Sequence, residues 1–452
     1  MKQKPPEPPD SRILNAYRFG SNPYRFLEGI QARFNDLAAI SVPGRAPVVI
    51  VTNPTLIHEI LSRPDEFKRL PVQDAAALVA EHGLVQTDGD LWRQQRDVTN
   101  PAFSGRRARL YADTVGKRTE EVAKEWKAPS IDGEHRNIHR EMTALTFSVA
   151  TEVILGERID EDRSREFYDW MHTTGEEFEV NLSSLKPQWV PDFPSRDFRE
   201  VAKGILDLSE EIIERRRESI ASGDISMEEP PRDMLSLLLV GERNPNVSYE
   251  ENQIRDEVAA MLIAGHETTA LSLTYSLALL SWHPDIRQKV REEATTVLGE
   301  DTPGYHHVSE LNFTDNVYRE VLRLYPPAWA SFREATGDVE LGEYTIENES
   351  GILLPQWSVH RDARYFENPN EFNPDRWNER NPDDYEPYFP FGSGPHKCVG
   401  RQFALSGARL ALARLIKEFD IDIPENALDD LSPGVTLRPR EGVPGTINWV
   451  EN

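Results

Sequence analysis

The stretch Phe391-Gly-Ser-Gly-Pro-His-Lys-Cys-Val-Gly400 holds the only cysteine of the 452-residue chain, Cys398. Glycines permit turns and close approaches that other residues resist, and this stretch contains three of them. An apolar-striped helix is predicted to follow over residues 401–419, and a helix N-terminus stabilises a thiolate. The alternative is a buried cysteine that acts as a small hydrophobe. The glycines, the aromatic residue and the basic residues around Cys398 favour a displayed thiolate ligand instead.

A second unusual stretch is Ala264-Gly-His-Glu-Thr-Thr269, which interrupts a long apolar helix predicted over residues 257–280. A glycine inside a helix costs about 0.5–1 kcal/mol relative to alanine, and a buried acid and threonine add desolvation. Such a combination indicates function, such as a groove for a small polar molecule like dioxygen. The alternative is a kink with satisfied polar groups. We expect His266 to point outward or to form a hydrogen bond. The polar interruption indicates a buried helix and not a membrane span.

Three further stretches complete a pattern: Asp90-Leu-Trp92-Arg-Gln-Gln-Arg96, Glu320-Val-Leu-Arg323 and Phe372-Asn-Pro-Asp-Arg376-Trp377. Taken alone, the stretch at residues 90–96 predicts only an aromatic and a basic side chain on one face of a surface helix. The spacing of Glu320 and Arg323 occurs by chance in many helices. In this order and spacing, the five stretches resemble the motifs of the cytochrome P450 family, whose cysteine loop reads F-x-x-G-x-[RH]-x-C-x-G. The resemblance covers roughly residues 20–450. It implies a mainly α (α+β) fold, in which a large helical region and a smaller β-rich region hold haem between the central helix and the cysteine loop.

The resemblance also implies a role for individual residues. Haem b (iron protoporphyrin IX) would have Cys398 as the axial ligand of its iron. Thr268 would be catalytic as a hydrogen-bond donor, and Glu267 as part of a proton relay. Ten residues are expected to bind the cofactor: Trp92, Arg96, Ala264, Gly265, Arg333, Phe391, Gly392, His396, Cys398 and Gly400. Of these, Trp92, Arg96, Arg333 and His396 would face the haem propionates. A structural network would join Glu320, Arg323 and Arg376 below the haem.

The implied function is that of a haem-thiolate monooxygenase, which inserts one oxygen atom from O2 into a hydrophobic small molecule by hydroxylation or epoxidation. A haem-thiolate peroxygenase or isomerase, or a non-enzymatic haem-based gas-binding protein, is the alternative. The Glu267–Thr268 pair favours the monooxygenase. No flavin or iron–sulfur motif is present, so electrons are expected from a ferredoxin and its reductase, guided by Lys397, Arg93 and Arg401.

The substrate is expected to be a fatty acid, terpenoid or steroid. Family position suggests that it touches mostly apolar segments, and no cationic anchor for a carboxylate stands out. The expected contacts are residues 71–87, a lid over residues 167–193, Ala260, Ala264, residues 328–332 and residues 435–437.

The composition is strongly acidic, with 77 Asp and Glu against 51 Lys and Arg, a net charge of −26. Only 11 of the basic residues are lysines. This charge disfavours nucleic acid and anionic membranes as partners, and it suggests adaptation to high salt, with an ordinary acidic cytosolic protein as the alternative. A single cysteine allows no internal disulfide, which fits a reducing, cytoplasmic location. We expect a monomer without membrane insertion.

The chain is predicted to consist of a Pro-rich flexible tail over residues 1–20 and a single domain over residues 21–452. The tail lacks the apolar region of a signal peptide or anchor. Periodicity predicts a strand at residues 48–51, small strands within residues 339–354 and a hairpin at residues 434–450. The predicted helices cover residues 17–35, 110–155, 196–220, 285–298 and 309–325.

Overall fold

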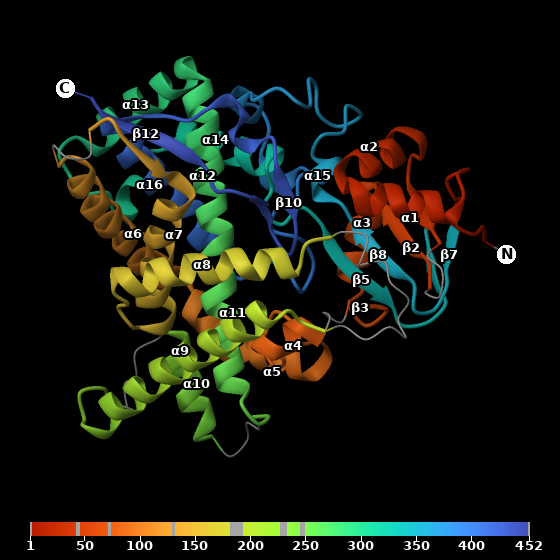
Figure 1. Cartoon of the computed structure of the whole chain (residues 1–452), viewed down its shortest axis with the longest axis horizontal. Helices are drawn as coiled ribbons and strands as arrows, with labels where there is room; N and C mark the ends of the chain where they lie inside the picture. The colour runs from red at the N-terminus through yellow and green to blue at the C-terminus, as the bar shows by residue number, and fades with distance from the viewer. Residues whose placement is uncertain are drawn as a thin grey trace.

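A computed structural model describes residues 2–41, 46–70, 74–128, 132–180, 193–226, 233–244 and 249–450. Figure 1 shows most of the helices gathered at the end of the molecule that holds the C-terminus, while α1 (Arg12–Ser21), α2 (Pro23–Arg33), α3 (Pro54–Ser62) and α15 (Gln356–Val359) lie at the other end. The strands of the largest sheet lie at the other end, with the N-terminus. The predicted mainly α architecture with a smaller β-rich region is confirmed.

The α-helices are α1 (Arg12–Ser21), α2 (Pro23–Arg33), α3 (Pro54–Ser62), α4 (Asp74–Ala80), α5 (Gly89–Thr99), α6 (Gly105–Trp126), α7 (Ile138–Ala150), α8 (Glu161–Glu177), α9 (Arg196–Ala221), α10 (Met234–Glu242), α11 (Gln253–Ala264), α12 (Glu267–Trp282), α13 (Pro284–Leu298), α14 (Asn312–Leu324), α15 (Gln356–Val359) and α16 (Arg401–Glu418). The shorter helical turns are η1 (Asn100–Phe103), η2 (Thr151–Leu155), η4 (Tyr305–His307), η5 (Pro374–Trp377), η6 (Pro382–Asp384) and η7 (Glu425–Leu428).

The strands are β1 (Leu37–Ile40), β2 (Val48–Val51), β3 (Phe67–Arg69), β4 (Glu134–Asn137), β5 (Ser331–Ala335), β6 (Val339–Leu341), β7 (Tyr344–Ile346), β8 (Gly351–Leu354), β9 (Phe419–Asp422), β10 (Leu431–Pro433), β11 (Leu437–Pro439) and β12 (Pro444–Trp449). The predicted strand at residues 48–51 and the small strands within residues 339–354 are confirmed.

The largest apolar core is built by α6, α7, α12, α13, α14 and α16. Helix α12 runs through its middle and is buried on all sides from Thr269 to Leu280. Its sequence has no polar face, and a helix that is apolar all round is stable only when other elements cover it. Among the described residues, no helix has both the length and the apolarity to span a membrane.

The central helix is not continuous, although the sequence predicted one helix over residues 257–280. Helix α11 ends at Ala264 and α12 begins at Glu267, with Gly265 and His266 between them. A side chain at position 265 would place its Cβ 2.7 Å from the Met261 carbonyl oxygen and 3.1 Å from Ile154 Cδ1. Glycine is therefore required where η2 packs against this break.

The largest sheet has the strand order β1-β2-β8-β5-β3, and only β2 and β8 run parallel. Its last two strands pair so that Arg69 lies directly opposite Arg333. Residues directly opposite each other in an antiparallel pair point to the same face of the sheet. The sheet thus brings together two guanidinium groups that are 264 residues apart in the chain.

Three of the predicted elements were wrong in detail. The helix predicted over residues 17–35 is two helices, α1 and α2, separated at Asn22 because Pro23 starts a new helix. The helix predicted over residues 110–155 is interrupted by β4, which pairs with β12. The hairpin predicted at residues 434–450 does not form, since β11 pairs with β10 while β12 pairs with β4 and β9.

Part of the segment predicted to be a flexible tail is ordered against the body of the molecule. Residues from Arg12 onward form α1, and the Ala39 N–H donates to the Pro6 carbonyl over 2.8 Å. The Gln3 N–H likewise donates to the Glu343 carbonyl over 3.0 Å. Backbone pairing explains why this proline-rich segment is held. The division of the chain at residue 20 stays a prediction.

Candidate active site

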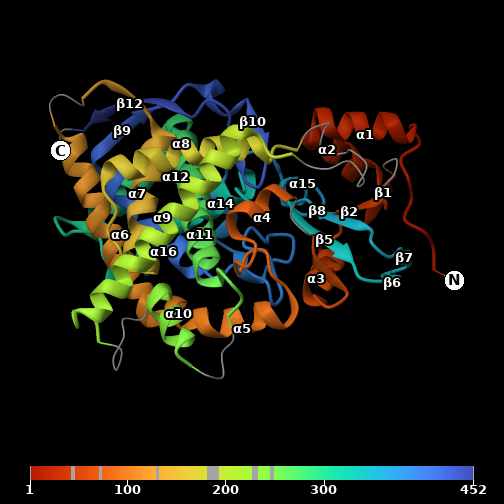
Figure 2. The same cartoon turned by 60° about the horizontal axis from the view of Figure 1, so that its bottom comes forward.

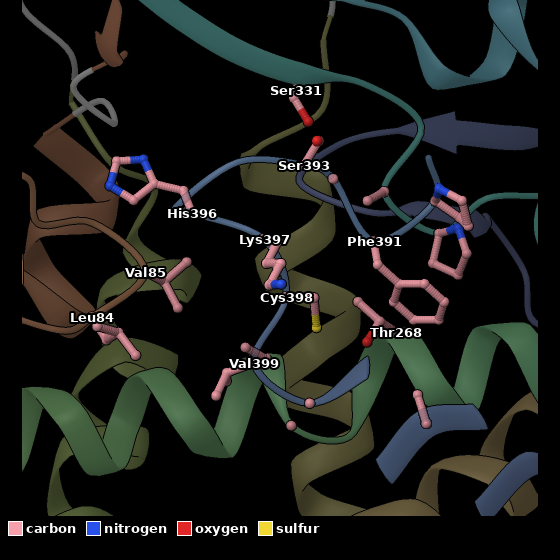
Figure 3. A pocket seen from close by; sticks show the side chains of 18 of the residues that line it. Leu84, Val85, Thr268, Ser331, Phe391, Ser393, His396, Lys397, Cys398 and Val399 are labelled. Atoms are coloured by element: carbon pink, nitrogen blue, oxygen red, sulfur yellow. The ribbon is translucent and has the colours of Figure 1, made fainter. Parts of the chain in front are cut away.

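A cavity of about 490 Å³ lies between the cysteine loop (residues 391–400) and the α11–α12 junction. Cys398 lines it from one element and Thr268 from another, and in Figure 3 the sulfur projects from its loop toward the helix that carries Thr268. Strand β5, helix α5 and residues 84–86 contribute further walls. The two unusual stretches of the sequence, 130 residues apart at Cys398 and Thr268, thus face one space.

The backbone of the cysteine loop is fixed by its own turns. The Cys398 N–H donates to the Phe391 carbonyl over 2.9 Å, which closes the loop. Gly392 and Gly394 both have φ of 68°, in the left-handed region that favours glycine. At Gly394 a Cβ would lie 2.0 Å from the Leu61 carbonyl oxygen, so no other residue fits there.

The thiol of Cys398 offers surface to the cavity but is otherwise enclosed. Burial raises its pKa, while a hydrogen bond from the Gly400 N–H and the positive charges of Arg96 and Arg401 lower it. These donors and charges are the groups that stabilise a thiolate once a cation is present to compensate for burial. The loop therefore presents a sulfur whose N–H and guanidinium neighbours favour the anionic form, while burial opposes it.

Three guanidinium groups gather at one edge of the cavity, on Arg69, Arg96 and Arg333. Arg96 Nη2 donates to the Lys397 carbonyl over 3.3 Å, and Arg333 Nη1 donates to the Phe332 carbonyl over 2.7 Å. Burial lowers the pKa of all three groups, to about 10 for Arg69. Buried cations gathered in this way require anionic partners.

Trp92 and His396 lie beside this cluster. The two rings meet edge to face, with centroids 4.2 Å apart. His396 Nε2 is 3.2 Å from Asp88 Oδ1, so the ring faces a carboxylate. Burial, together with the charges of Arg69, Arg333 and Arg96, lowers the pKa of His396 to about 3, which leaves it neutral near pH 7.

Sequence reasoning missed Arg69 and Asp88. Arg69 belongs to the short strand β3 and reaches the cavity only through its pairing with β5. Asp88 accepts a hydrogen bond from the Arg69 N–H over 2.6 Å. Neither residue lies in a stretch with a distinctive local pattern, so only the tertiary contacts could have found them.

The residues present fit a haem group. The cavity offers a soft thiolate donor on one wall, and such a donor suits iron. Guanidinium groups at the edge match the two carboxylates that a haem carries. Phe391, Gly392 and Gly400 line the cavity on the sulfur side, and Ala264 and Gly265 line the opposite side. All ten of the predicted cofactor-binding residues lie on this cavity.

Glu267 does not line the cavity, although its neighbour Thr268 does. Its side chain is buried and forms an ion pair with Arg438, and the Thr436 hydroxyl donates to its Oε1 over 3.1 Å. Successive residues of a helix point about 100° apart, which explains why the threonine and the acid face different spaces. The structure therefore separates the two residues that were predicted to act as a pair.

A second cavity, of about 10 Å³, lies behind Glu267 and is lined by His139, Thr143, Tyr168, Met171, His172, His266, Glu267, Arg438 and Pro439. His266 is fully buried, so the outward orientation was wrong, but the expected hydrogen bond forms between its Nδ1 and the Leu262 carbonyl at 2.5 Å. His266 Nε2, His139 Nδ1 and Arg438 Nε are buried without hydrogen-bond partners among the described residues. A space of this size and polarity suits one water molecule.

Glu320, Arg323 and Arg376 come together away from the cavity. Arg323 donates to both carboxylate oxygens of Glu320, over 2.8 and 3.0 Å, and Arg376 Nε donates to Oε1 over 2.9 Å. Arg323 also donates to the carbonyls of His360, Pro369 and Glu371. This network joins α14 to the segment before the cysteine loop, and it has no atom in the cavity wall.

The expected substrate contacts are only partly brought to the cavity. Leu84, Val85, Gln86, Ala264, Ala328, Ser331 and Phe332 line it. Among the described residues, Ala260, residues 435–437 and residues 167–180 do not. The remainder of the predicted lid, residues 181–192, lies outside the described residues, as do residues 71–73.

The three cations expected on the thiolate side differ in their surroundings. Arg93 is paired with Asp90 and, over 3.1 Å, with Asp65, while Arg401 is paired with Asp383. Lys397 is exposed. Two of the three positive charges are therefore neutralised by neighbouring acids.

Comparison with known proteins agrees with this geometry. The family model described as Cytochrome P450 matches residues 5–443. An echinocystic acid 23-monooxygenase of Saponaria officinalis is 28% identical over 425 residues, covering 89% of this chain and 80% of that protein. A cytokinin hydroxylase of Arabidopsis thaliana is 30% identical over 412 residues, covering 88% and 79%. An 11-oxo-beta-amyrin 30-oxidase of Glycyrrhiza uralensis is 28% identical over 417 residues, covering 89% and 78%. With a thiolate loop, a guanidinium edge and a family match over nearly its whole length, the chain belongs to the cytochrome P450 family.

Proposed function

We propose that Cys398 and Thr268 serve one reaction from opposite walls of the cavity. The chain is a haem-thiolate monooxygenase that inserts one oxygen atom from O2 into a hydrophobic small molecule, with electrons from a separate donor. The observation that supports these two residues most strongly is that both line the same cavity. When bound, the haem supplies oxygen activation, which electron donation from a thiolate favours.

In this proposal, Cys398 would hold the haem iron through its sulfur, and the Gly400 N–H would donate a hydrogen bond to that sulfur. Trp92, Arg96, Arg333 and His396 hold the propionates, and we add Arg69, which lies directly opposite Arg333. His396 contributes as a neutral donor, which its burial next to three guanidinium groups supports. The residues that would pack against the haem also line the cavity: Ala264, Gly265, Phe391, Gly392 and Gly400. Glu320, Arg323 and Arg376 fix the segment that leads into the cysteine loop.

We assign proton delivery to Thr268, which lines the large cavity, and to Glu267, which does not. The Thr268 hydroxyl donates a hydrogen bond inside the cavity, and Glu267 holds the proton that replaces the one given up. Glu267 is ion-paired with Arg438 and borders the small polar cavity, from which water would resupply a proton. A positioned proton donor of this kind contributes about 100-fold or more to a rate.

A Thr268→Ala substitution tests the proposal. We expect haem and substrate binding to be retained, while product formation falls by about 100-fold because the proton is no longer positioned. The reducing equivalents then appear as hydrogen peroxide. Thr268→Ser, which keeps the hydroxyl, serves as the matched control and retains most of the product. Well-coupled turnover in Thr268→Ala would overturn the role of this residue.

The substrate class follows from the apolar character of the cavity wall, which includes Leu84, Ala264, Ala328 and Phe332. We propose a fatty acid, terpenoid or steroid. The named activities of the relatives, on echinocystic acid and 11-oxo-beta-amyrin, support a bulky lipophilic molecule. Screening a lipophilic library for haem absorbance shifts tests this assignment.

We also propose that a ferredoxin and its reductase supply the electrons and that the enzyme is a cytoplasmic monomer without membrane insertion. Residues 21–452 are proposed to form its single domain. Lys397 is the strongest candidate for steering a donor, because acidic neighbours already pair with Arg93 and Arg401.

The acidic composition supports adaptation to high salt. A surface with net charge −26 repels itself in dilute buffer, and salt screens that repulsion. We therefore expect the free energy of unfolding to rise with KCl concentration. Urea unfolding of the holoenzyme across a KCl series measures this, and maximal stability in dilute buffer would rule the adaptation out.

A further inference from the structure

The segment between α4 and α5, residues 81–88, forms one wall of the cavity through Leu84, Val85 and Gln86. Figure 3 shows Leu84 and Val85 on the same side of the cavity as His396. We call residues 82–87 the wall loop. Its position determines how much room a ligand has above the thiolate, so the contacts that hold it matter for binding.

Two successive acids of α11 hold the backbone of the wall loop. Asp256 Oδ2 accepts a hydrogen bond from the His82 N–H, and Glu257 Oε2 accepts one from the Leu84 N–H, both over 3.0 Å. Between them, a Cβ on Gly83 would lie 2.8 Å from Ala260 Cβ and 2.9 Å from the Asp256 carbonyl oxygen. The loop therefore lies directly against α11, which Figure 2 shows beside α4.

The carbonyl groups of the wall loop are held by permanent donors. Arg69 Nη1 donates to the Leu84 carbonyl over 2.6 Å and to the Thr87 carbonyl over 3.3 Å. Gln95 Nε2 donates to the His82 carbonyl over 2.5 Å. These donors keep their hydrogens near neutral pH, so a proton-dependent change in the contacts between the wall loop and α11 must come from the two acids.

The two acids have different surroundings. Asp256 is 3.1 Å from the guanidinium group of Arg255, which also faces Glu210 of α9 at 3.5 Å. Glu257 is fully buried, and its Oε1 has no hydrogen-bond partner among the described residues. A charge on Glu257 would therefore be poorly compensated, whereas a charge on Asp256 has a cation beside it.

The other charged and titratable groups near Glu257 do not compensate for its charge. Tyr249, which precedes α11, donates its hydroxyl to the Leu238 carbonyl over 3.1 Å. Glu242 at the end of α10 is a further acid, and His82 of the wall loop uses its backbone N–H for Asp256. Burial accordingly raises the pKa of Glu257 to about 8, opposed by the Leu84 N–H and reinforced by Asp256.

We propose that Glu257 is a proton-dependent latch on the wall loop and thereby a positioning residue for the ligand. With its proton, the side chain stays buried, accepts from the Leu84 N–H and holds Leu84 and Val85 in the cavity wall. Without its proton, the buried charge favours release of the loop, because water can then reach the carboxylate. This inference rests on the proposed function only in that ligands bind in this cavity.

The direction of the pH effect follows from the proton count. The latched state binds the Glu257 proton more tightly than the released state, in which the carboxylate is hydrated. Raising the pH therefore favours release. With the pKa of Glu257 at about 8 in the latched state, the ratio of released to latched protein rises about tenfold between pH 7 and pH 9, so a ligand that needs the latched wall should bind up to about tenfold more weakly at pH 9.

The test is an equilibrium titration of the ferric holoenzyme with phenylimidazole, a neutral probe whose imidazole binds the iron and whose ring is large enough to reach the wall. The haem absorbance shift gives the dissociation constant at each pH. Carbon monoxide binding to the reduced protein provides a small-ligand control that does not reach the wall. We expect the phenylimidazole dissociation constant to rise by up to about tenfold between pH 7 and pH 9, with no change for carbon monoxide.

Two variants make the assignment specific. Glu257→Gln keeps an acceptor of the same shape without a titrating proton, so its dissociation constant should be the same at pH 7 and pH 9. Asp256→Asn, at the preceding residue of α11, should still show a dissociation constant that rises with pH, because Glu257 still titrates. Glu257→Leu should bind phenylimidazole weakly at both pH values. If that variant does not fold, the Glu257→Gln and Asp256→Asn variants still test the role of Glu257.

A wild-type affinity that does not change with pH, or a Glu257→Gln variant that keeps the change, would overturn the latch. Failure of the proposed function is seen separately, as a reduced carbon monoxide complex without the spectrum of a haem-thiolate protein. A normal thiolate spectrum with a flat phenylimidazole profile would therefore remove the latch alone.

Discussion

The two walls of the active-site cavity are built in different ways. On the thiolate side, Cys398 is held by groups within ten residues of it, among them the Phe391 carbonyl and the Gly400 N–H. On the threonine side, the α11–α12 junction depends on partners that are distant in sequence. Glu267 pairs with Arg438, and Glu257 holds Leu84.

This difference decides what each side can do. A loop closed by its own turns, with contacts to Arg96 and Leu61 from elsewhere in the chain, presents one fixed ligand. A junction held by remote, buried polar contacts responds when any of those contacts changes its charge, because an unpaired buried charge is costly. We therefore propose that the thiolate side supplies a constant chemical group, while the threonine side adjusts proton supply and ligand access.

The largest expected effect lies on the thiolate side. Cys398→Ala removes the ligand around which the loop is closed, so we expect complete loss of the thiolate-type absorbance of the reduced carbon monoxide complex, together with loss of turnover. Absorbance difference spectroscopy of the purified protein measures this. A Ser393→Ala variant in the same loop serves as the control and should keep the spectrum. A thiolate-type spectrum in Cys398→Ala would show that Cys398 is not the sulfur ligand and would contradict the proposed difference between the two walls.

The next effect tests whether the threonine side depends on a remote buried pair. Arg438→Met leaves Glu267 buried without its cation, and the two side chains are each only 6% exposed. We expect the free energy of unfolding in urea to fall by about 3–5 kcal/mol. The thiolate-side counterpart is Arg401→Met, whose pair with Asp383 is 29% and 38% exposed, and which should cost no more than about 1 kcal/mol. Equal losses in the two variants would contradict the contrast between the sides.

The smallest effect concerns acid stability. Burial lowers the pKa of both His139 and His266 to about 3, so the unfolded chain, with imidazole pKa values near 6.5, binds more protons. The stability that the two neutral histidines contribute to the folded protein is complete above about pH 6.5 and is lost as the pH falls toward 3. Between pH 7 and pH 5 we expect each to lower the free energy of unfolding by about 2 kcal/mol.

A His139→Gln and His266→Gln double variant, unfolded in urea at both pH values, should lose correspondingly less stability on acidification than the wild type. The exposed His135→Gln serves as its control and should behave as the wild type does. An unchanged pH dependence in the double variant would show that the small polar cavity does not hold neutral imidazoles.

Much of the fold could be predicted because apolar periodicity reports which face of an element is buried. The boundaries that failed share one cause, which is pairing with a distant strand. Strand β4 interrupts a helical pattern because β12 lies beside it, and the predicted C-terminal hairpin fails because β12 pairs with β4 and β9 instead. A window of neighbouring residues contains no information about such partners.

The sequence by itself determined the thiolate side, since the cysteine, its glycines and its closing aromatic residue are contiguous and act through local backbone geometry. It also located Thr268, because a glycine and polar residues inside an apolar helix are conspicuous. Only the tertiary structure decided that Glu267 turns to Arg438, that Arg69 joins Arg333 and that Glu257 holds Leu84. The physical reason is that the charge state of a buried group depends on what lies within a few ångströms of it, and the chain brings those neighbours from far along its length.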